Sequence, residues 1–278
     1  MKSIKVIGAA ILFLALGFSI AYNKHFPYGV IIQLKEFFIA KKELGRISDT
    51  SNYVEVDLNK ADSTGVFLTY GQSNSVNQGQ IGYEVKEEVF MHFQGKTYKY
   101  KDPSLGGSGI DGSVWGMVGD KLIKSGAYNR VVFANSGLGG RKLEELNKGK
   151  HFDYLVANYQ SLKDKFGKVD GILFHQGESE IEPDNVDNYY KNFEEFISNL
   201  EAKGITIPIY LSRASYCYSL NTKITDIQDS LIKEYEIVRE GPNTDLLTDK
   251  KYRLPDNCHF SQAGYDRFSD MWVEYLTD

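Results

Sequence analysis

Short apolar runs alternate with amphipathic stretches from about residue 65 to the end of the chain. Five runs have the length and composition of buried strands, at residues 65–70, 130–135, 171–175, 207–212 and, more weakly, 245–248. Between them, apolar side chains recur with helical spacing at residues 114–122, 152–159, 189–200, 224–235 and 265–276. We interpret these stripes as core faces of helices. The alternation predicts an α/β domain with a parallel sheet and helices on both faces.

Residues 79–109 interrupt this alternation. Two strand-like runs, residues 89–93 and 97–100, flank Gln94 and Gly95, a pattern that predicts a β-hairpin. We expect the hairpin to be a surface excursion that walls one side of any site at the end of the first strand.

The N-terminus has a different character. Lys2 and Lys5 precede an uncharged run at residues 6–22, whose 17 residues fall between a signal-peptide core and a spanning helix. We favour a membrane anchor, an N-terminal hydrophobic helix, over a cleaved signal peptide; a buried helix of the domain is the third interpretation. The basic flank places the rest of the chain outside the cytoplasm, in the cell envelope or secreted.

The chain therefore divides into three predicted parts. Residues 1–22 are the anchor or signal, residues 23–64 a juxtamembrane helix and polar linker, and residues 65–278 the main domain. The juxtamembrane helix, at residues 30–44, either lies against the membrane or docks on the domain, and the pattern favours neither.

Composition narrows the function classes. With 32 Lys and Arg against 37 Asp and Glu, the net charge of −5 argues against a nucleic-acid partner. Two cysteines, Cys217 and Cys258, are too few for a disulfide scaffold or a four-cysteine zinc site. No helix carries a metal-ligand spacing and no strand precedes a phosphate loop, so we expect no metal and no organic cofactor.

Polar clusters follow the predicted strands. They are Gly71–Asn74, Asn135–Gly140, His175–Ser179 and, after a loop, Asp256–Phe260. Because parallel strands end at one edge of a sheet, and such sheets bind ligands there, we expect the four clusters to meet.

The clusters contain the parts of a nucleophilic site. A hydroxyl such as that of Ser73 needs a general base, and His259 is the best base available. Asp256 lies three residues earlier, close enough to orient the imidazole, which completes a Ser–His–Asp set. The backbone N–H groups of Ser73 and of Gly139 or Gly140 are candidate oxyanion donors. The side-chain amide of Gln176 is a third.

Taken together, the clusters resemble the SGNH (GDSL-like) hydrolases, and among them the carbohydrate acetylesterases related to sialate O-acetylesterase and acetylxylan esterase. The blocks that carry the resemblance are GQSN at 71–74, Gly139–Gly140, HQGES at 175–179 and D-x-x-H at 256–259. The resemblance implies a three-layer α/β/α sandwich with a parallel, flavodoxin-like sheet of about five strands.

The resemblance also implies roles. Ser73 would be the nucleophile, His259 the base and Gln176 an oxyanion donor. Glu178, in the HQGES block, competes with Asp256 as the acidic partner of His259. Three further residues would face the substrate: Asn74, Trp115 and Arg141.

Some features stay open. Arg141 follows the glycine block where relatives often place a small polar residue, and it either meets an anionic sugar or forms a surface salt bridge. Glu180 follows HQGES where relatives usually have Asp. Cys217 and Cys258 are either a disulfide near the site or two unpaired thiols.

The resulting expectation is a serine esterase that hydrolyses O-acetyl esters of carbohydrates. Its partners would be an acetylated carbohydrate and, through the N-terminal segment, a membrane. The alternatives are an O-acetyltransferase acting on an envelope polysaccharide and a catalytically dead carbohydrate-binding homologue.

Overall fold

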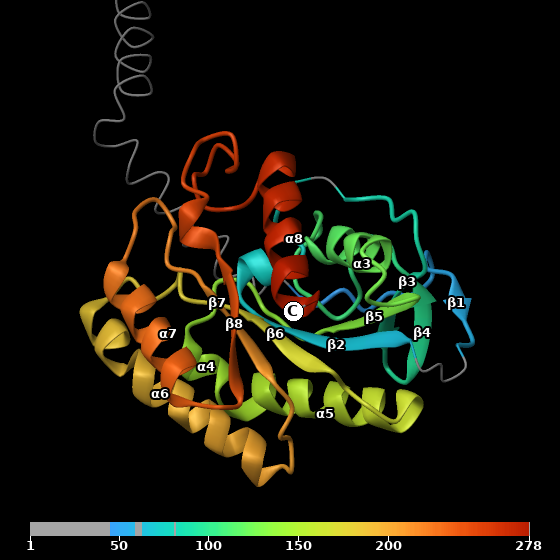
Figure 1. Cartoon of the computed structure of the whole chain (residues 1–278), viewed down its shortest axis with the longest axis horizontal. Helices are drawn as coiled ribbons and strands as arrows, with labels where there is room; N and C mark the ends of the chain where they lie inside the picture. Colours follow the sequence, from blue (N-terminus) through green and yellow to red (C-terminus); the bar gives the residue numbers. More distant parts are fainter. Residues whose placement is uncertain (1–44, 59–62, 81, 278) are drawn as a thin grey trace, which may run out of the picture. The chain divides into compact units, whose positions relative to one another are not determined.

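An eight-stranded mixed sheet organises the computed structural model, which describes residues 45–58, 63–80 and 82–277 (Figure 1). The order across the sheet is β1-β4-β3-β5-β2-β6-β7-β8. The strands are β1 (Glu55–Val56), β2 (Thr64–Gly71), β3 (Val89–Phe93), β4 (Lys96–Lys99), β5 (Arg130–Asn135), β6 (Gly171–His175), β7 (Ile209–Arg213) and β8 (Val238–Asn243). All pairs are parallel except β1 with β4 and β4 with β3.

The predicted α/β class with a mostly parallel sheet is confirmed. The expected count of about five strands is wrong, because the hairpin adds β3 and β4 and the segment before the main domain adds β1. The expected strand at residues 245–248 is also wrong. The strand that follows β7 in the chain is β8, which ends at Asn243. The short helix η2 (Thr244–Leu246) occupies the first half of the range expected to be a strand. The sequence of β8, VREGPN, lacks an apolar run because β8 is an edge strand, where a proline is tolerated.

Helices cover both faces of the sheet (Figure 1). The helices are α3 (Trp115–Lys124), α4 (Leu143–Leu146), α5 (Gly149–Phe166), α6 (Pro183–Ala202), α7 (Thr222–Glu234) and α8 (Gln262–Thr277). Val66 and Leu68 of β2 share one apolar core with buried residues of α5, α6 and α7, and Phe67 shares the other with α3 and α8. This split follows from the alternation of side chains along a strand. The predicted apolar stripes are confirmed as core faces.

The hairpin at residues 89–99 belongs to the sheet. β3 pairs in parallel with β5, and every residue of β3 is buried. The expected surface excursion is therefore wrong. A hairpin whose first strand alternates little between apolar and polar residues is better suited to a position between two strands.

Residues 45–58, expected to be linker, pack on the domain. β1 pairs with β4, and the Tyr53 hydroxyl donates to the carbonyl of Pro103. The compact unit runs from Gly45 to Asp278. The predicted hydrophobic helix at residues 1–22 and juxtamembrane helix at 30–44 lie outside the described residues. Within the described ranges, no helix is both long and apolar enough to cross a membrane.

Trp115 provides a test of this packing. Its fully buried indole lies 5.8 Å from the ring of Phe133 and 5.6 Å from that of Trp272, and its N–H donates to Ser75 O at 2.9 Å. Trp115→Ala should lower the free energy of unfolding by about 3–5 kcal/mol, measured by urea denaturation. Ile110→Ala, at a side chain that is 75% exposed, is the control and should change it by less than about 0.5 kcal/mol. If both substitutions changed the free energy of unfolding by the same small amount, Trp115 would not be part of the core.

Candidate active site

The first cluster is built on a close approach of two strand ends. Gly71, at the end of β2, has φ +132°, and a Cβ there would lie 1.9 Å from the carbonyl oxygen of His175. Only glycine allows this approach. Gln72 then donates its N–H to the same oxygen at 3.0 Å, and the chain turns into η1 (Ser73–Ser75), where Ser73 is 5% exposed. The ends of β2 and β6 thus hold the Ser73 turn.

The last cluster holds the predicted base and acid in contact. His259 Nδ1 lies 2.7 Å from Asp256 Oδ2, and Asp256 Oδ1 accepts the backbone N–H groups of Cys258 and His259 at 3.0 Å each. Burial alone would raise the pKa of Asp256, but these hydrogen bonds outweigh it and lower that pKa to about 2. The carboxylate is therefore ionised and accepts a hydrogen bond from Nδ1–H, which leaves Nε2 as the ring nitrogen that can act as a base.

These two clusters are joined by hydrogen bonds between their neighbours. Asn74 Nδ2 donates to the carbonyl of Cys258 at 3.3 Å. Gln80 donates its N–H to Phe260 O at 3.1 Å, and its side-chain oxygen accepts the N–H of Gln262 at 2.7 Å. The segments that carry Ser73 and His259 are thus adjacent at the carboxyl edge of the sheet.

A disulfide attaches a third loop to the same place. Cys217 and Cys258 are bonded, which answers the question that the sequence left open. Tyr218 also donates its N–H to Asn257 O at 3.2 Å. The loop that follows β7 is therefore fixed to the His259 loop.

Arg253 supports this loop and was missed by the sequence reasoning. The side chain is 4% exposed and donates to the carbonyls of Cys258 at 2.6 Å, Leu247 at 2.7 Å and Thr244 at 3.0 Å. Burial lowers the pKa of Arg253 to about 10. Nothing in the surrounding sequence distinguishes it from a surface arginine.

The two candidate acids occupy different positions. Glu178 is 4% exposed, accepts Asn74 Nδ2 at 2.8 Å, and lies 3.4 Å from His175 Nδ1. Asp256 is the acid that contacts His259. Glu178 is therefore hydrogen-bonded to Asn74 of the Ser73 turn, and Asp256 to the imidazole of His259.

Two of the predicted oxyanion donors already have acceptors. The N–H of Gly139 donates to Ser108 Oγ at 2.8 Å. The Gln176 amide donates to Glu180 Oε1 at 2.7 Å and to Arg141 O at 3.3 Å.

Glu180 also joins this cluster to the start of α4. Its Oε1 accepts the N–H of Leu143, the first residue of α4, at 2.7 Å. Burial raises the pKa of Glu180.

Two of the three residues expected to face a substrate, Asn74 and Trp115, lie beneath the surface, whereas Arg141 is partly exposed. Asn74 and Trp115 have no exposed area, so a direct contact with substrate is corrected to a supporting role. Arg141 Nη1 pairs with Glu145 Oε1 at 2.8 Å, the salt bridge named as its alternative.

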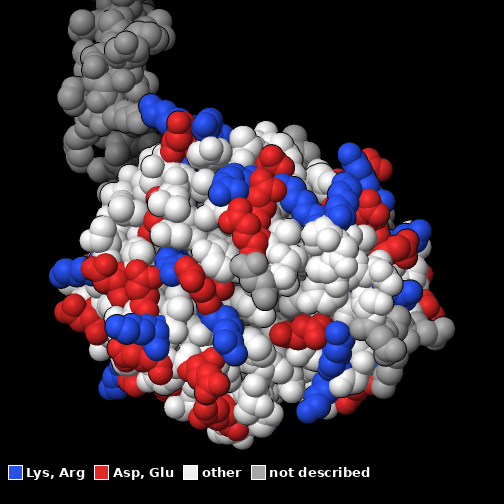
Figure 2. Space-filling view, in the orientation of Figure 1, with Lys and Arg blue, Asp and Glu red and all other residues white. Residues whose placement is uncertain are grey.

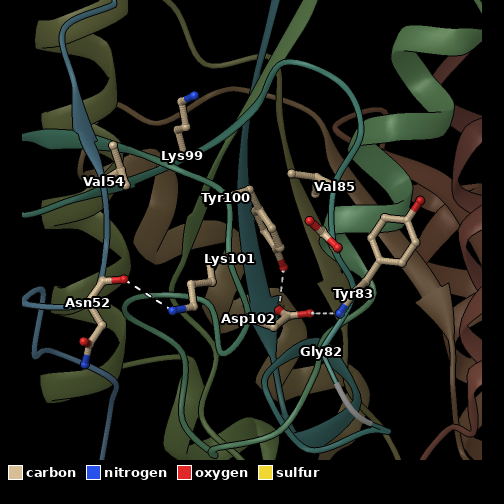
Figure 3. Close-up of a pocket in the computed structure, with 10 residues that line it drawn as sticks. Asn52, Val54, Gly82, Tyr83, Val85, Lys99, Tyr100, Lys101 and Asp102 are labelled. Atoms are coloured by element: carbon tan, nitrogen blue, oxygen red, sulfur yellow. Dashed lines mark hydrogen bonds between the residues drawn. The ribbon is translucent and has the colours of Figure 1, made fainter.

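A cavity of about 640 Å³ lies elsewhere, between residues 52–54, 82–85 and 99–102 (Figure 3). Tyr83 donates its N–H and Tyr100 its hydroxyl to Asp102, and Lys101 donates to Asn52 O. None of the predicted site residues lines this cavity.

Charges are mixed on the surface. Figure 2 shows acidic and basic side chains interleaved over one face of the described part, without a broad patch of one sign. Among the described residues, no group of three or more His, Cys, Asp or Glu side chains could hold a metal ion.

Comparison with known proteins adds a family and a fold. Residues 63–277 match the family described as carbohydrate esterase, sialic acid-specific acetylesterase. No curated protein matches the sequence.

Three solved structures share the fold. A protein from Arabidopsis thaliana has a TM-score of 0.64 at 14% identity, over 77% of this chain and 97% of that one. NanS has a TM-score of 0.54 at 15% identity, over 79% of this chain and 98% of its own. A carbohydrate acetylesterase from Xanthomonas citri has a TM-score of 0.51 at 15% identity, over 75% of this chain and 54% of that one. At such identities these likenesses show the fold alone.

The Asp256 interaction predicts a pH dependence of stability. A carboxyl whose pKa falls on folding, here from 3.8 to about 2, stabilises the folded state above the unfolded pKa. That stabilisation disappears as the pH falls from about 4 to about 2. Melting temperatures of wild type and Asp256→Asn should therefore differ at neutral pH and converge in this window. A difference that is constant with pH would contradict it. In a His259→Asn background the difference should shrink, because the imidazole partner is gone.

Proposed function

Because the chain belongs to the carbohydrate esterase family of sialic acid-specific acetylesterases, we propose that it is a serine esterase that removes O-acetyl groups from a carbohydrate. Membership confirms the resemblance inferred from the polar clusters. One observation carries the proposal for this chain's own residues. His259 and Asp256 lie 2.7 Å apart in one loop. The carbonyl of Cys258 in that loop accepts a hydrogen bond from Asn74 of the Ser73 turn.

In the proposed mechanism, Ser73 Oγ attacks the acetyl carbonyl carbon while His259 Nε2 takes the hydroxyl proton. The bond between the carbonyl carbon and the sugar oxygen then breaks, and the imidazolium returns its proton to that oxygen. Water, deprotonated by His259, then attacks the acetyl-Ser73 ester. The bond between the carbonyl carbon and Ser73 Oγ breaks, the imidazolium returns the proton to Oγ, and acetate leaves. Asp256 keeps Nδ1 protonated and stabilises the imidazolium.

The developing oxyanion needs donors that are not already engaged. We assign this role to the backbone N–H groups of Ser73 and Gly140. Gly139 and Gln176 would first have to release Ser108, Glu180 or Arg141. A Cβ at Gly140 would meet nothing within 4 Å, which supports access for a substrate there.

The remaining predicted residues receive indirect roles. Asn74 and Glu178 hold the Ser73 turn against the His259 loop. For Arg141 we keep a substrate role. A sugar that carries a carboxylate, as sialic acids do, would compete with Glu145 for its guanidinium.

We also propose that the protein works outside the cytoplasm. The Cys217–Cys258 disulfide supports this, because such bonds persist in oxidising compartments and are rare in the cytosol.

Replacing Ser73 tests the function directly. Ser73→Ala should lower kcat for acetate release from O-acetylated sialic acids or xylan by about 10⁶-fold, with its melting temperature unchanged. A fluorophosphonate probe should label wild type and leave Ser73→Ala unlabelled. Full activity in the variant would overturn the assignment.

The same assay separates hydrolysis from transfer. With an acetyl donor and a polysaccharide acceptor, a hydrolase yields free acetate and a transferase yields acetylated sugar. A folded protein that neither reacts with the probe nor hydrolyses any ester would be the dead homologue.

A further inference from the structure

We propose that Arg46 is a positioning residue for the oxyanion donors of this site, although it precedes the region that matches the family, residues 63–277. The inference rests on the proposed esterase function. It assigns a positioning role to a segment that the sequence pattern presents as a polar linker.

The Arg46 guanidinium holds the start of the glycine block. Its Nη1 donates to the carbonyls of Gly137 at 2.7 Å, Ser136 at 3.0 Å and Gly106 at 2.9 Å. The first two belong to the loop that follows β5, and Gly106 belongs to the loop after the hairpin. One side chain therefore clamps two loops together at the edge where the polar clusters meet.

Fixing the Gly137 carbonyl also fixes the next peptide N–H, because the two groups share one planar unit. That N–H belongs to Leu138 and donates to Gly71 O at 2.9 Å. Gly71 comes two residues before Ser73. Arg46 is thus connected, through one peptide plane, to the chain that carries the nucleophile.

The backbone around Arg46 reaches the glycine block by a second route. Arg46 forms an antiparallel bridge with Ser108, and Ile47 exchanges hydrogen bonds with Gly107 O and the Gly106 N–H at 2.9 Å each. Ser108 Oγ in turn accepts the N–H of Gly139 at 2.8 Å. Both the side chain and the main chain at position 46 therefore support residues 136–139.

Carbonyl oxygens and an aromatic ring surround the charge of Arg46 in the described part of the chain. The guanidinium carbon lies 4.1 Å from the ring centroid of Tyr154, and among the described residues no carboxylate forms an ion pair with Arg46. Burial lowers its pKa, and tyrosines rather than acids oppose that shift. A half-buried cation that, among the described residues, is compensated by carbonyl oxygens and a ring face leaves positive potential near the glycine block.

Lysine would not reproduce this arrangement. Its ammonium can donate to carbonyls but lacks the planar group that lies over the Tyr154 ring while Nη1 reaches all three carbonyls. Loss of the clamp should displace the glycine block relative to Ser73, and a displacement of about 1 Å costs roughly 10²-fold in rate.

The test uses the full chain and three variants, Arg46→Ala, Arg46→Lys and Tyr53→Phe. Tyr53→Phe is the matched control, because it removes another contact of the same segment, the bond to Pro103 O, away from the glycine block. Hydrolysis of p-nitrophenyl acetate gives kcat and KM, and thermal melting reports folding at the assay temperature.

We expect Arg46→Ala to lower kcat roughly 10²-fold with KM within about twofold, Arg46→Lys to recover only a minor part, and Tyr53→Phe to match wild type. Millimolar guanidinium should partly restore Arg46→Ala. A folded Arg46→Ala with wild-type kcat would overturn the inference, as would an equal loss in Tyr53→Phe. Absence of Ser73-dependent activity in the wild type would instead overturn the proposed function.

Discussion

Asn74 makes the interaction on which the rest of the candidate site depends. Its buried amide donates to Glu178 on one side and to the carbonyl of Cys258 on the other, so it connects three of the four polar clusters. A buried amide without partners is costly, and each partner here is itself buried. The Ser73 turn and the His259 loop are therefore held together through this one buried amide.

Buried charges explain why the cluster around Asn74 takes this form. Arg253 lies beneath the His259 loop with almost no exposure, and Glu178 and Asp245, followed by Asp256, are the acids that offset its charge. Without Glu178, Arg253 would lose a compensating charge, which is expensive in a low-dielectric interior. Glu178 thus stabilises the cation that holds the His259 loop, while Asp256 orients the imidazole. Both acids belong to the candidate site, and of the two only Asp256 contacts His259.

Much of the fold could be predicted, because burial on one or both faces leaves a periodic signal. The four strands β2, β5, β6 and β7 are apolar runs, and the helices carry stripes that pack on them. Strand β8 was not predicted because an edge strand needs little apolar sequence. Strand β1 was not predicted because two residues are too few to show an alternation. In the candidate site, Ser73, His259 and Asp256 could be proposed from their positions after strands. The positions of Arg253 and Arg46 could not be predicted. Each guanidinium donates to carbonyl groups that only the folded chain brings near it.

The sequence by itself determined the α/β class and the order of the polar clusters, and it supplied the candidate residues for acyl transfer. These follow from local patterns, since strand and helix periods and the residues after each strand are properties of short segments. Tertiary structure decided which acid meets His259, that Asn74 and Trp115 lie inside, and that Cys217 and Cys258 are bonded. It also turned residues 45–58 from a linker into part of the domain. Those outcomes depend on distances between segments far apart in the chain, and such distances exist only once the sheet has formed.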